Sequence, residues 1–258
     1  MTKNSIYLLC TDFDGTLYSE SHSPRIPEKL IEMIQELRKQ GMLWMVNTGR
    51  DLEYLLESLV EHSSGVMPDY IGVVEREVFK YRSGEYHPVN HWNQHSRAAH
   101  KTLFERHSPL MSEVSEWISS QFQAEVYEDL HSPVCLIAKN NEDADQILVN
   151  SKLKDFSDLA WVRNDVYARF SHANIHKGTI LNEVSKLHKL HATGIIAAGD
   201  HFNDIPMLNR RFANHLVAPS NAIPEVQDHI ARNNGYISHF EAGHGVLDGL
   251  RVLLEKEF

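Results

Sequence analysis

The stretch that decides the fold is Leu8-Leu9-Cys10-Thr11-Asp12-Phe13-Asp14-Gly15-Thr16. It begins in a short apolar run, from Ile6 to Cys10, and two carboxylates follow where this run ends in a turn that contains glycine. Residues i and i+2 of an extended segment point to the same side, so Asp12 and Asp14 converge at the end of a predicted strand. Their mutual repulsion requires a cation, a shared proton or two separated pKa values. For this stretch alone, an Asp-rich turn without a chemical role is the alternative.

Three further segments place polar groups at a strand end or a helix start. In the run from Leu43 to Asp51, an apolar strand ends in the Thr48 hydroxyl and Gly49, and the helix start that follows is a cradle for an anion. Lys177 opens an amphipathic helix, where a cation opposes the helix dipole unless an anion is near. The run from Ile195 to Asp204 is another apolar strand that ends in acidic and amide side chains. Together the segments make a turn without a role the weaker interpretation of the first stretch.

The two ends of the chain predict an α/β fold, a Rossmann-like doubly wound core with a mainly parallel sheet. From Ile6 to about Val74 strands alternate with helices, and the alternation resumes at Lys177. Strands that are apolar on both faces, with helices between them, indicate a parallel sheet covered on both sides. Ligands bind such sheets at the carboxyl ends of the strands, where Asp12, Thr48 and Asp200 are expected.

The middle of the chain has the pattern of an inserted α+β domain with antiparallel strands. A hairpin is predicted around Ser83-Gly84, and a long helix from about 93 to 122 is predicted to be interrupted at Ser108-Pro109. Further predicted elements are a helix over 142–153 and strands over 125–129, 134–139, 159–163 and 167–171. We therefore predict a core domain over residues 1–77 and 173–258, and an inserted cap domain over 78–172.

These segments resemble the motifs of the haloacid dehalogenase (HAD) superfamily of phosphatases. The likeness is to the large-cap branch with Cof-type sugar phosphatases, sucrose-phosphate phosphatases and phosphomannomutases. The family's D-x-D-G-T loop matches Asp12 to Thr16, its strand-end Thr matches Thr48, and its Lys matches Lys177. Its G-D-x-x-N-D matches Gly199 to Asp204, and the run from Val217 to Val226 resembles the segment that closes the core. The resemblance thus covers both ends of the chain and leaves the middle poorly matched.

The resemblance implies a phosphatase that uses Mg²⁺ and forms an aspartyl-phosphate. Asp12 would be the nucleophile, and Asp14 would be the general acid and base. Mg²⁺ would lie between the Asp12 carboxylate, the Asp14 backbone carbonyl and Asp200, with Asp204 near its coordination shell. The residues implied to hold the phosphoryl oxygens are Thr48, Gly49, Lys177 and Asn203. The presence of Asp14 favours phosphoryl transfer over dehalogenation.

The expected substrate is a small phosphorylated metabolite, with a sugar phosphate as the first candidate. A phosphomutase or phosphotransferase on the same fold would share the aspartyl-phosphate and differ in the acceptor of the phosphoryl group. A noncatalytic protein that binds phosphorylated metabolites is a third interpretation. It predicts the loss of Asp12, Asp14 or Asp200, and all three are present.

One stretch near the predicted hinge departs from the family pattern. Members of this branch often have Asn-Gly and a small residue after the third core strand, where this chain has Val74-Glu75-Arg76-Glu77. The departure alters the hinge and the edge of the site, so it weakens any analogy of substrate within the branch. Arg76 could reach a substrate anion, or it could be a solvated hinge residue paired with a neighbouring glutamate.

Strand alternation in the inserted domain gives two candidate selectivity residues. It predicts that Val126, Ile137, Val162 and Phe170 face the helices of this domain. The residues predicted on the opposite face are Tyr127, Trp161, Arg163, Tyr167 and Arg169. Aromatic rings beside guanidinium groups suit a polyhydroxylated or doubly anionic ligand, which makes Arg163 and Arg169 the candidates. A solvated strand surface is the alternative.

Composition limits the partners and cofactors. The chain has 258 residues and a formal charge of −10, which argues against a nucleic acid or an anionic membrane as partner. No apolar run approaches the roughly 20 residues that span a bilayer, and the first residues do not read as a signal peptide, so we expect a cytoplasmic protein. Neither the 2 Cys nor the 17 His have the spacing of a zinc site, and the cofactor that the resemblance implies is Mg²⁺.

Overall fold

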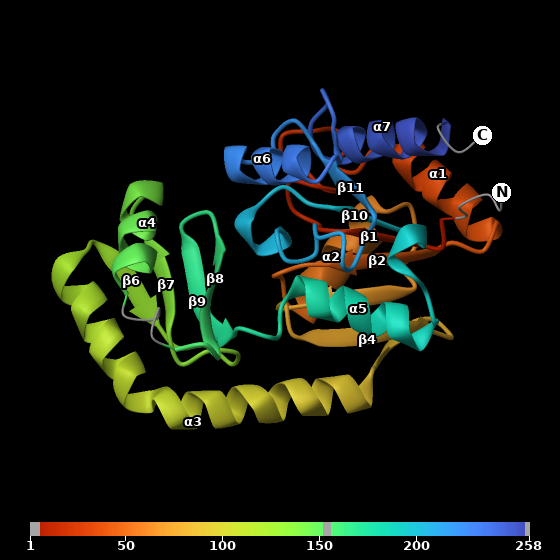
Figure 1. The fold of residues 1–258 in the computed structure, drawn as a ribbon. Coiled ribbons are helices and arrows are strands. Elements are labelled where there is room, and N and C mark those ends of the chain that lie inside the picture. The colour runs from red at the N-terminus through yellow and green to blue at the C-terminus, as the bar shows by residue number, and fades with distance from the viewer. Residues whose placement is uncertain (1–5, 152–155, 256–258) are drawn as a thin grey trace. The chain divides into compact units, whose positions relative to one another are not determined.

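The computed structural model describes residues 6–151 and 156–255. Its contacts divide the chain into two compact units, one formed by Met1–Trp92 with Lys177–Phe258 and the other by Asn93–His176 (Figure 1). Leu153, at the end of a predicted helix, and the outermost residues of the predicted core, 1–5 and 256–258, lie outside the described residues.

The first unit contains an eight-stranded sheet with the order β12-β11-β10-β1-β2-β3-β4-β5. Its strands are β1 (Leu8–Thr11), β2 (Leu43–Asn47), β3 (Tyr70–Val73), β4 (Glu77–Arg82), β5 (Glu85–Pro88), β10 (Ile195–Ala198), β11 (His215–Ala218) and β12 (Tyr236–Ile237). Neighbours from β12 to β3 pair in parallel, while β3, β4 and β5 pair antiparallel. The predicted α/β core with a mainly parallel sheet is confirmed. Because β1 pairs with β2 on one side and β10 on the other, its carboxyl end is the point where the strand order reverses.

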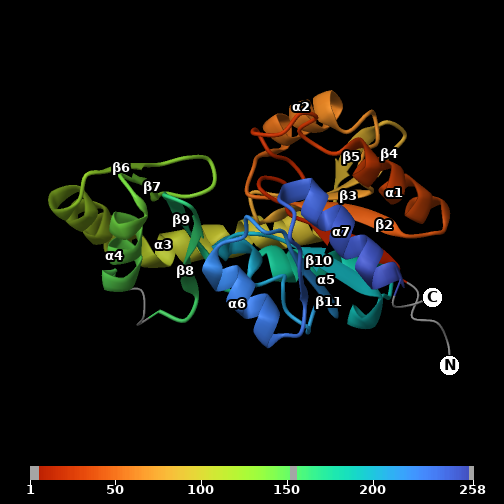
Figure 2. The same cartoon turned by 90° about the horizontal axis from the view of Figure 1, so that it is seen from above.

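Helices cover both faces of this sheet (Figure 2). They are α1 (Glu28–Lys39), α2 (Leu52–His62), α5 (Lys177–Leu187), α6 (Pro224–Arg232) and α7 (Ala242–Glu255). Leu9 and Trp44 belong to the buried cluster shared with α1, α2 and α7, whereas Cys10 and Met45 belong to the cluster shared with α5 and α6. Cys10 is therefore a small core residue, and burial raises the pKa of its thiol to about 12. None of the described helices is both long and apolar enough to cross a membrane.

The hairpin of β4 and β5 belongs to the core sheet, which corrects the predicted domain boundary at residue 77. β4 pairs with β3 in the register Val73↔Glu77. Both faces of β4 contribute to the core, since Val78 lies in one buried cluster and Phe79 in the other. The second unit begins at Asn93 and ends at His176, instead of at the predicted residues 78 and 172. Alternation within a hairpin predicts strands, but it does not say to which sheet they add.

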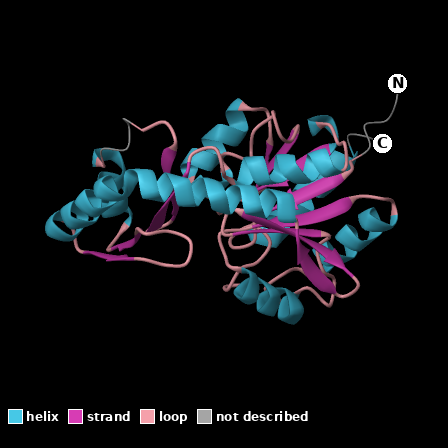
Figure 3. Ribbon diagram, turned by 90° about the horizontal axis from the view of Figure 1, so that it is seen from below, coloured by secondary structure: helices cyan, strands magenta, loops and turns pink. Residues whose placement is uncertain are grey.

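The second unit is an antiparallel sheet with the order β6-β7-β9-β8, covered by helices (Figure 3). Its strands are β6 (Ala124–Tyr127), β7 (Cys135–Ala138), β8 (Leu159–Asn164) and β9 (Tyr167–His172), and its helices are α3 (Asn90–Gln121), which begins in the first unit, and α4 (Asn141–Asn150). The predicted interruption at Ser108-Pro109 is wrong, because α3 contains Pro109. Figure 1 shows that this helix bends, which is how a helix accommodates a proline.

The register of β7 differs from the prediction by one residue. Leu136 and Ala138 lie in the buried cluster with the helices, and Ile137, predicted to face them, is 40% exposed. Leu136 pairs with Val126, so these two residues share the helix-covered face, as predicted for Val126. Leu136 and Ile137 are adjacent aliphatic residues, so alternation alone could not decide which of them faces the helices.

The register of β8 is also shifted. Trp161 pairs with Phe170 and stacks on its ring at 4.0 Å, so both residues face the helices and Val162 faces away. Arg163 was predicted on the face opposite the helices, but it lies on the helix-covered face and binds Asp145 and Asn141 of α4. Tyr127, Tyr167 and Arg169 lie on the opposite face of the sheet, as predicted, although Arg169 is only 3% exposed there. Tryptophan and arginine are amphipathic, so their placement follows from partners that the sequence pattern does not reveal.

Candidate active site

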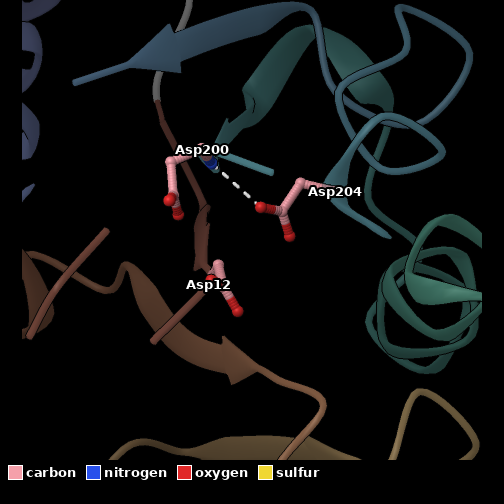
Figure 4. A group of neighbouring side chains, drawn as sticks. All are labelled: Asp12, Asp200 and Asp204. Atoms are coloured by element: carbon pink, nitrogen blue, oxygen red, sulfur yellow. Dashed lines mark hydrogen bonds between the residues drawn. The ribbon is translucent and has the colours of Figure 1, made fainter. Parts of the chain in front are cut away.

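The carboxylates of Asp12, Asp200 and Asp204 form a buried group in the first unit (Figure 4). One oxygen of each lies within 4.8 Å of the others. Asp12 directly follows β1, and its amide donates a hydrogen bond of 2.9 Å to the Ala198 carbonyl at the end of β10. The parallel pairing of β1 with β10 thus brings together residues that lie far apart in the sequence.

Lys177 links two of these carboxylates. Its side chain is fully buried, and Nζ donates hydrogen bonds of 2.6 Å to Asp12 Oδ1 and 2.6 Å to Asp204 Oδ1. Burial alone would lower the pKa of the ammonium group, but the neighbouring carboxylates raise it above its usual value. A lysine in the first turn of α5 therefore has the anionic partners that its position requires.

Asp204 organises the loop after β10. Its Oδ2 accepts hydrogen bonds of 2.9 Å each from the backbone amides of Asp200 and His201, the first of which is drawn in Figure 4. A side chain at Gly199 would place its Cβ 2.5 Å from the Asp204 Cβ, so only glycine fits this approach. With Oδ1 bound to Lys177, both oxygens of Asp204 are engaged, which suits the expected place near a coordination shell.

The carboxylates of Asp12 and Asp200 lie in surroundings where negative charges outnumber the single positive charge of Lys177. Burial, followed by the Asp204 charge, raises the pKa of Asp12 well above its usual range. The same causes raise the pKa of Asp200 to about 7, although Thr16 Oγ1 donates a hydrogen bond of 2.6 Å to it. Three buried carboxylates face one lysine, and their hard oxygen donors fit a divalent cation such as Mg²⁺.

Asp14 lies outside this group and forms an ion pair with Arg50. The guanidinium donates from Nε to Oδ2 at 2.7 Å and from Nη2 to Oδ1 at 2.5 Å, so both Asp14 oxygens are bound. Ser58 and the ring of Phe13, whose centroid is 5.0 Å from the guanidinium carbon, hold Arg50 from other sides. Arg50 was missed as a site residue. The available signal was a basic residue directly after Thr48-Gly49, at the start of a helix.

The residues expected to hold phosphoryl oxygens surround a further carboxylate, Glu75. Thr48 and Asn203 are buried, and the Asn203 Nδ2 donates a hydrogen bond of 2.9 Å to Glu75 Oε1. A Cβ on Gly49 would lie 2.8 Å from the same oxygen. The charge of Glu75 also helps to raise the pKa of Lys177. In the sequence this stretch departs from the family pattern, but the sequence did not predict that Glu75 lies in the site.

On the face of the second sheet that points away from its helices, Arg169 is buried among polar and aromatic side chains. Tyr167 Oη donates to Cys135 Sγ at 3.8 Å, and Cys135 is directly opposite Arg169 in the sheet. Burial raises the pKa of Asp129, but backbone amide donors and the Arg169 charge outweigh it and leave that pKa below its usual value. Arg163 does not share this face, so the structure does not bring the two candidate arginines together.

The chain matches the model of the haloacid dehalogenase-like hydrolase family over residues 9–71 and 95–250. No curated protein matches it. Similar solved structures include the sucrose-phosphatase of Synechocystis sp. PCC6803 in complex with sucrose and phosphate, at a TM-score of 0.69 and 15% identity over 96% of this chain and 97% of that chain. BT1666 from Bacteroides thetaiotaomicron gives a TM-score of 0.61 and 19% identity, covering 97% of this chain and 96% of that chain.

The subclass IIB sugar phosphatase BT4131 is similar as well, with a TM-score of 0.65 and 16% identity over 96% of this chain and 98% of that chain. At these identities the likeness concerns the fold, and it agrees with the large-cap branch expected from the sequence. The family match covers most of the chain. This protein therefore belongs to the haloacid dehalogenase-like hydrolase family.

Proposed function

We propose that this protein is a Mg²⁺-dependent phosphatase that hydrolyses a small phosphorylated metabolite, a sugar phosphate, through an aspartyl-phosphate on Asp12. The observation that carries the proposal is the position of Asp12 at the tip of β1, bound to Lys177 and within 4.8 Å of Asp200 and Asp204. A carboxylate nucleophile needs a cationic environment to approach an anionic phosphoryl group, which Lys177 and a Mg²⁺ ion held by these carboxylates would supply.

The first half of the reaction transfers the phosphoryl group to Asp12. A carboxylate oxygen of Asp12 attacks phosphorus, and the bond between phosphorus and the substrate oxygen breaks. Mg²⁺ held by Asp12, Asp200 and the Asp14 carbonyl would offset the charge of the phosphoryl group and keep it in line. Thr48, Gly49, Lys177 and Asn203 would hold the phosphoryl oxygens by hydrogen bonds.

Asp14 would move the protons. It would donate one to the departing substrate oxygen, then take one from the water that attacks the aspartyl-phosphate. Arg50 occupies both Asp14 oxygens in this structure. Asp14 therefore has to exchange that contact for one with the substrate, and Arg50 would hold the carboxylate ready between turnovers.

Two observations support a sugar phosphate as the substrate class. Similar structures include a sucrose-phosphatase with bound sucrose and phosphate and a protein named as a sugar phosphatase. In this chain, Tyr127, Tyr167 and Arg169 share one face of the second sheet, where rings and a guanidinium can contact a polyhydroxylated ligand.

The test is phosphate release from a panel of phosphorylated metabolites, with and without Mg²⁺. We expect release from sugar phosphates, its loss after chelation of divalent cations, and its return with Mg²⁺ but poorly with Ca²⁺. Asp12→Asn should lower kcat/KM by about 10³-fold or more, because the amide is a poor nucleophile.

The matched control is Asp228→Asn, the same substitution at an exposed carboxylate in α6 that pairs with Arg232. It should retain full activity. If Asp12→Asn releases phosphate as fast as Asp228→Asn, the covalent mechanism is wrong. If metal-free protein keeps full activity, the role of Mg²⁺ is wrong. Transfer of the phosphoryl group to an added sugar, with little release to water, would instead identify a phosphotransferase.

A further inference from the structure

The turn between β3 and β4 has an unusual backbone. Its two central residues, Val74 and Glu75, have φ values of 48° and 52°, in the left-handed region. The Arg76 amide closes the turn with a hydrogen bond of 3.0 Å to the Val73 carbonyl. Positive φ at both central positions is the conformation that Asn-Gly adopts readily, whereas it is strained for a β-branched or a long side chain. The chain therefore keeps an unfavourable pair of residues at this turn.

The strained turn is bound to the loop that follows β2. The Val74 amide donates a hydrogen bond of 3.0 Å to the Arg50 carbonyl, and the Glu75 amide donates one of 3.3 Å to the Thr48 carbonyl. These contacts fix the base of the Glu75 side chain beside Thr48-Gly49. Backbone strain of this kind is found at functional sites, where the rest of the fold holds the residue in place.

The Glu75 carboxylate lies among the groups proposed to bind phosphate. Glu75 is 3% exposed, and its Oε1 accepts a hydrogen bond of 2.9 Å from the Asn203 amide. The same oxygen lies close to Gly49, and the charge of the carboxylate acts on Lys177. A carboxylate oxygen accepts hydrogen bonds as a phosphoryl oxygen does, so Glu75 occupies a donor that a bound phosphate would use. It also adds a negative charge beside the position of a dianion.

We propose that Glu75 is a built-in competitor of phosphate. Its carboxylate engages Asn203 when the site holds no phosphoryl group, repels inorganic phosphate after hydrolysis and so hastens release of the product. This inference rests on the proposed phosphatase function. The opposite role is that Glu75 only orients the Asn203 amide, in which case removal of its charge would leave phosphate binding unchanged or weaker.

The test is the affinity for inorganic phosphate, measured by titration calorimetry in saturating Mg²⁺. Glu75→Gln keeps the length and the acceptor oxygen but removes the charge, and we expect it to bind phosphate about tenfold more tightly, which is about 1.4 kcal/mol. Phosphate should also become a stronger product inhibitor by about the same factor. Glu75→Asp, which withdraws the charge by one methylene, should show a smaller gain in affinity.

The matched control is Glu57→Gln, the same substitution at an exposed glutamate in α2. It should leave the affinity for phosphate unchanged. If Glu75→Gln binds phosphate no more tightly than wild type while both hydrolyse phosphate esters, this inference alone is wrong. If wild type neither hydrolyses any phosphate ester nor binds phosphate, the proposed function fails and the inference falls with it.

Discussion

Two carboxylates that lie two residues apart in one loop have very different surroundings. Asp12 is buried and bound by Lys177, whose ammonium group is itself fully buried. Asp14 is 38% exposed at its side chain and is bound by Arg50, which is 25% exposed. A buried charge that loses its partner cannot be solvated, whereas an exposed one can exchange its partner for water or a ligand. Burial therefore holds the contact between Asp12 and Lys177, whereas the contact between Asp14 and Arg50 can be replaced during a reaction.

The largest expected effect is the loss of activity when Asp14, whose contact with Arg50 can be exchanged, is replaced. Asp14→Asn should lower kcat/KM for an alkyl phosphate by about 10²–10⁴-fold, because the amide cannot transfer a proton. The loss should be much smaller for an aryl phosphate, whose leaving group needs little protonation. Steady-state kinetics on both substrates is the measurement. Equal losses on the two substrates would show that Asp14 does not act as a general acid.

The comparison also predicts unequal costs in stability. Lys177→Met leaves Asp12 and Asp204 buried without their partner and should lower the free energy of unfolding by about 3–5 kcal/mol. Arg50→Met breaks the half-exposed pair and should cost about 1 kcal/mol or less. Urea denaturation of both variants in the absence of metal measures the difference. Similar costs would mean that burial does not distinguish the two contacts.

A third prediction concerns pH and the metal-free protein. The pKa of Asp200 is raised to about 7, so between about pH 4 and pH 7 the folded state binds a proton that the unfolded state has released. The free energy of unfolding should therefore fall as the pH rises through this range, and Asp12 acts with the same sign. Asp200→Asn should be more stable than wild type at pH 8 by on the order of 2–4 kcal/mol, and similar to it at pH 4.

Urea denaturation at the two pH values, with a chelator present, checks this prediction. Asp228→Asn is the control, since it makes the same substitution at an exposed carboxylate. A difference between Asp200→Asn and wild type that is the same at both pH values would contradict the electrostatic account of the buried carboxylates.

The smallest expected effect separates two arginines of the second unit. Arg169→Ala should lower kcat/KM for the best sugar phosphate by about tenfold and leave an aryl phosphate nearly unchanged. Arg163 binds α4 through Asp145 and Asn141, so Arg163→Ala should lower the free energy of unfolding and alter both substrates alike. Kinetics on the two substrates, with a denaturation curve for each variant, makes the test. Equal effects of Arg169→Ala on both substrates would remove it from substrate selection.

Sequence alone predicted the fold of the core well, and most of the candidate site residues lie at strand ends or helix starts. Asp12, Asp200 and Lys177 each follow or begin an element whose apolar pattern is clear, and parallel pairing then brings such positions together. The pattern was weaker for Arg50 and Glu75. Both reach the site through specific contacts, to Asp14 and to Asn203, that depend on side-chain length and on an unusual backbone.

The second unit was predicted less well for a physical reason. Its strands were located to within a few residues, but the faces of β7 and β8 were inverted. Alternation sets the phase of a strand only where apolar and polar residues differ clearly. Leu136-Ile137 and Trp161-Val162 are adjacent apolar pairs, so packing against α3 and α4 decides their orientation. Likewise, the sequence predicts the hairpin after Val73, but long-range packing decides that this hairpin joins the core sheet.

The most direct test of the central claim is to trap the covalent intermediate. Protein mixed with a ³²P-labelled sugar phosphate and Mg²⁺ is quenched in acid within the first turnover, and the labelled peptide is identified by mass spectrometry. The account predicts a label on Asp12 that hydroxylamine removes, and no label on Asp12→Asn. Hydrolysis in wild type without a labelled Asp12, or with the label on another residue, would contradict it.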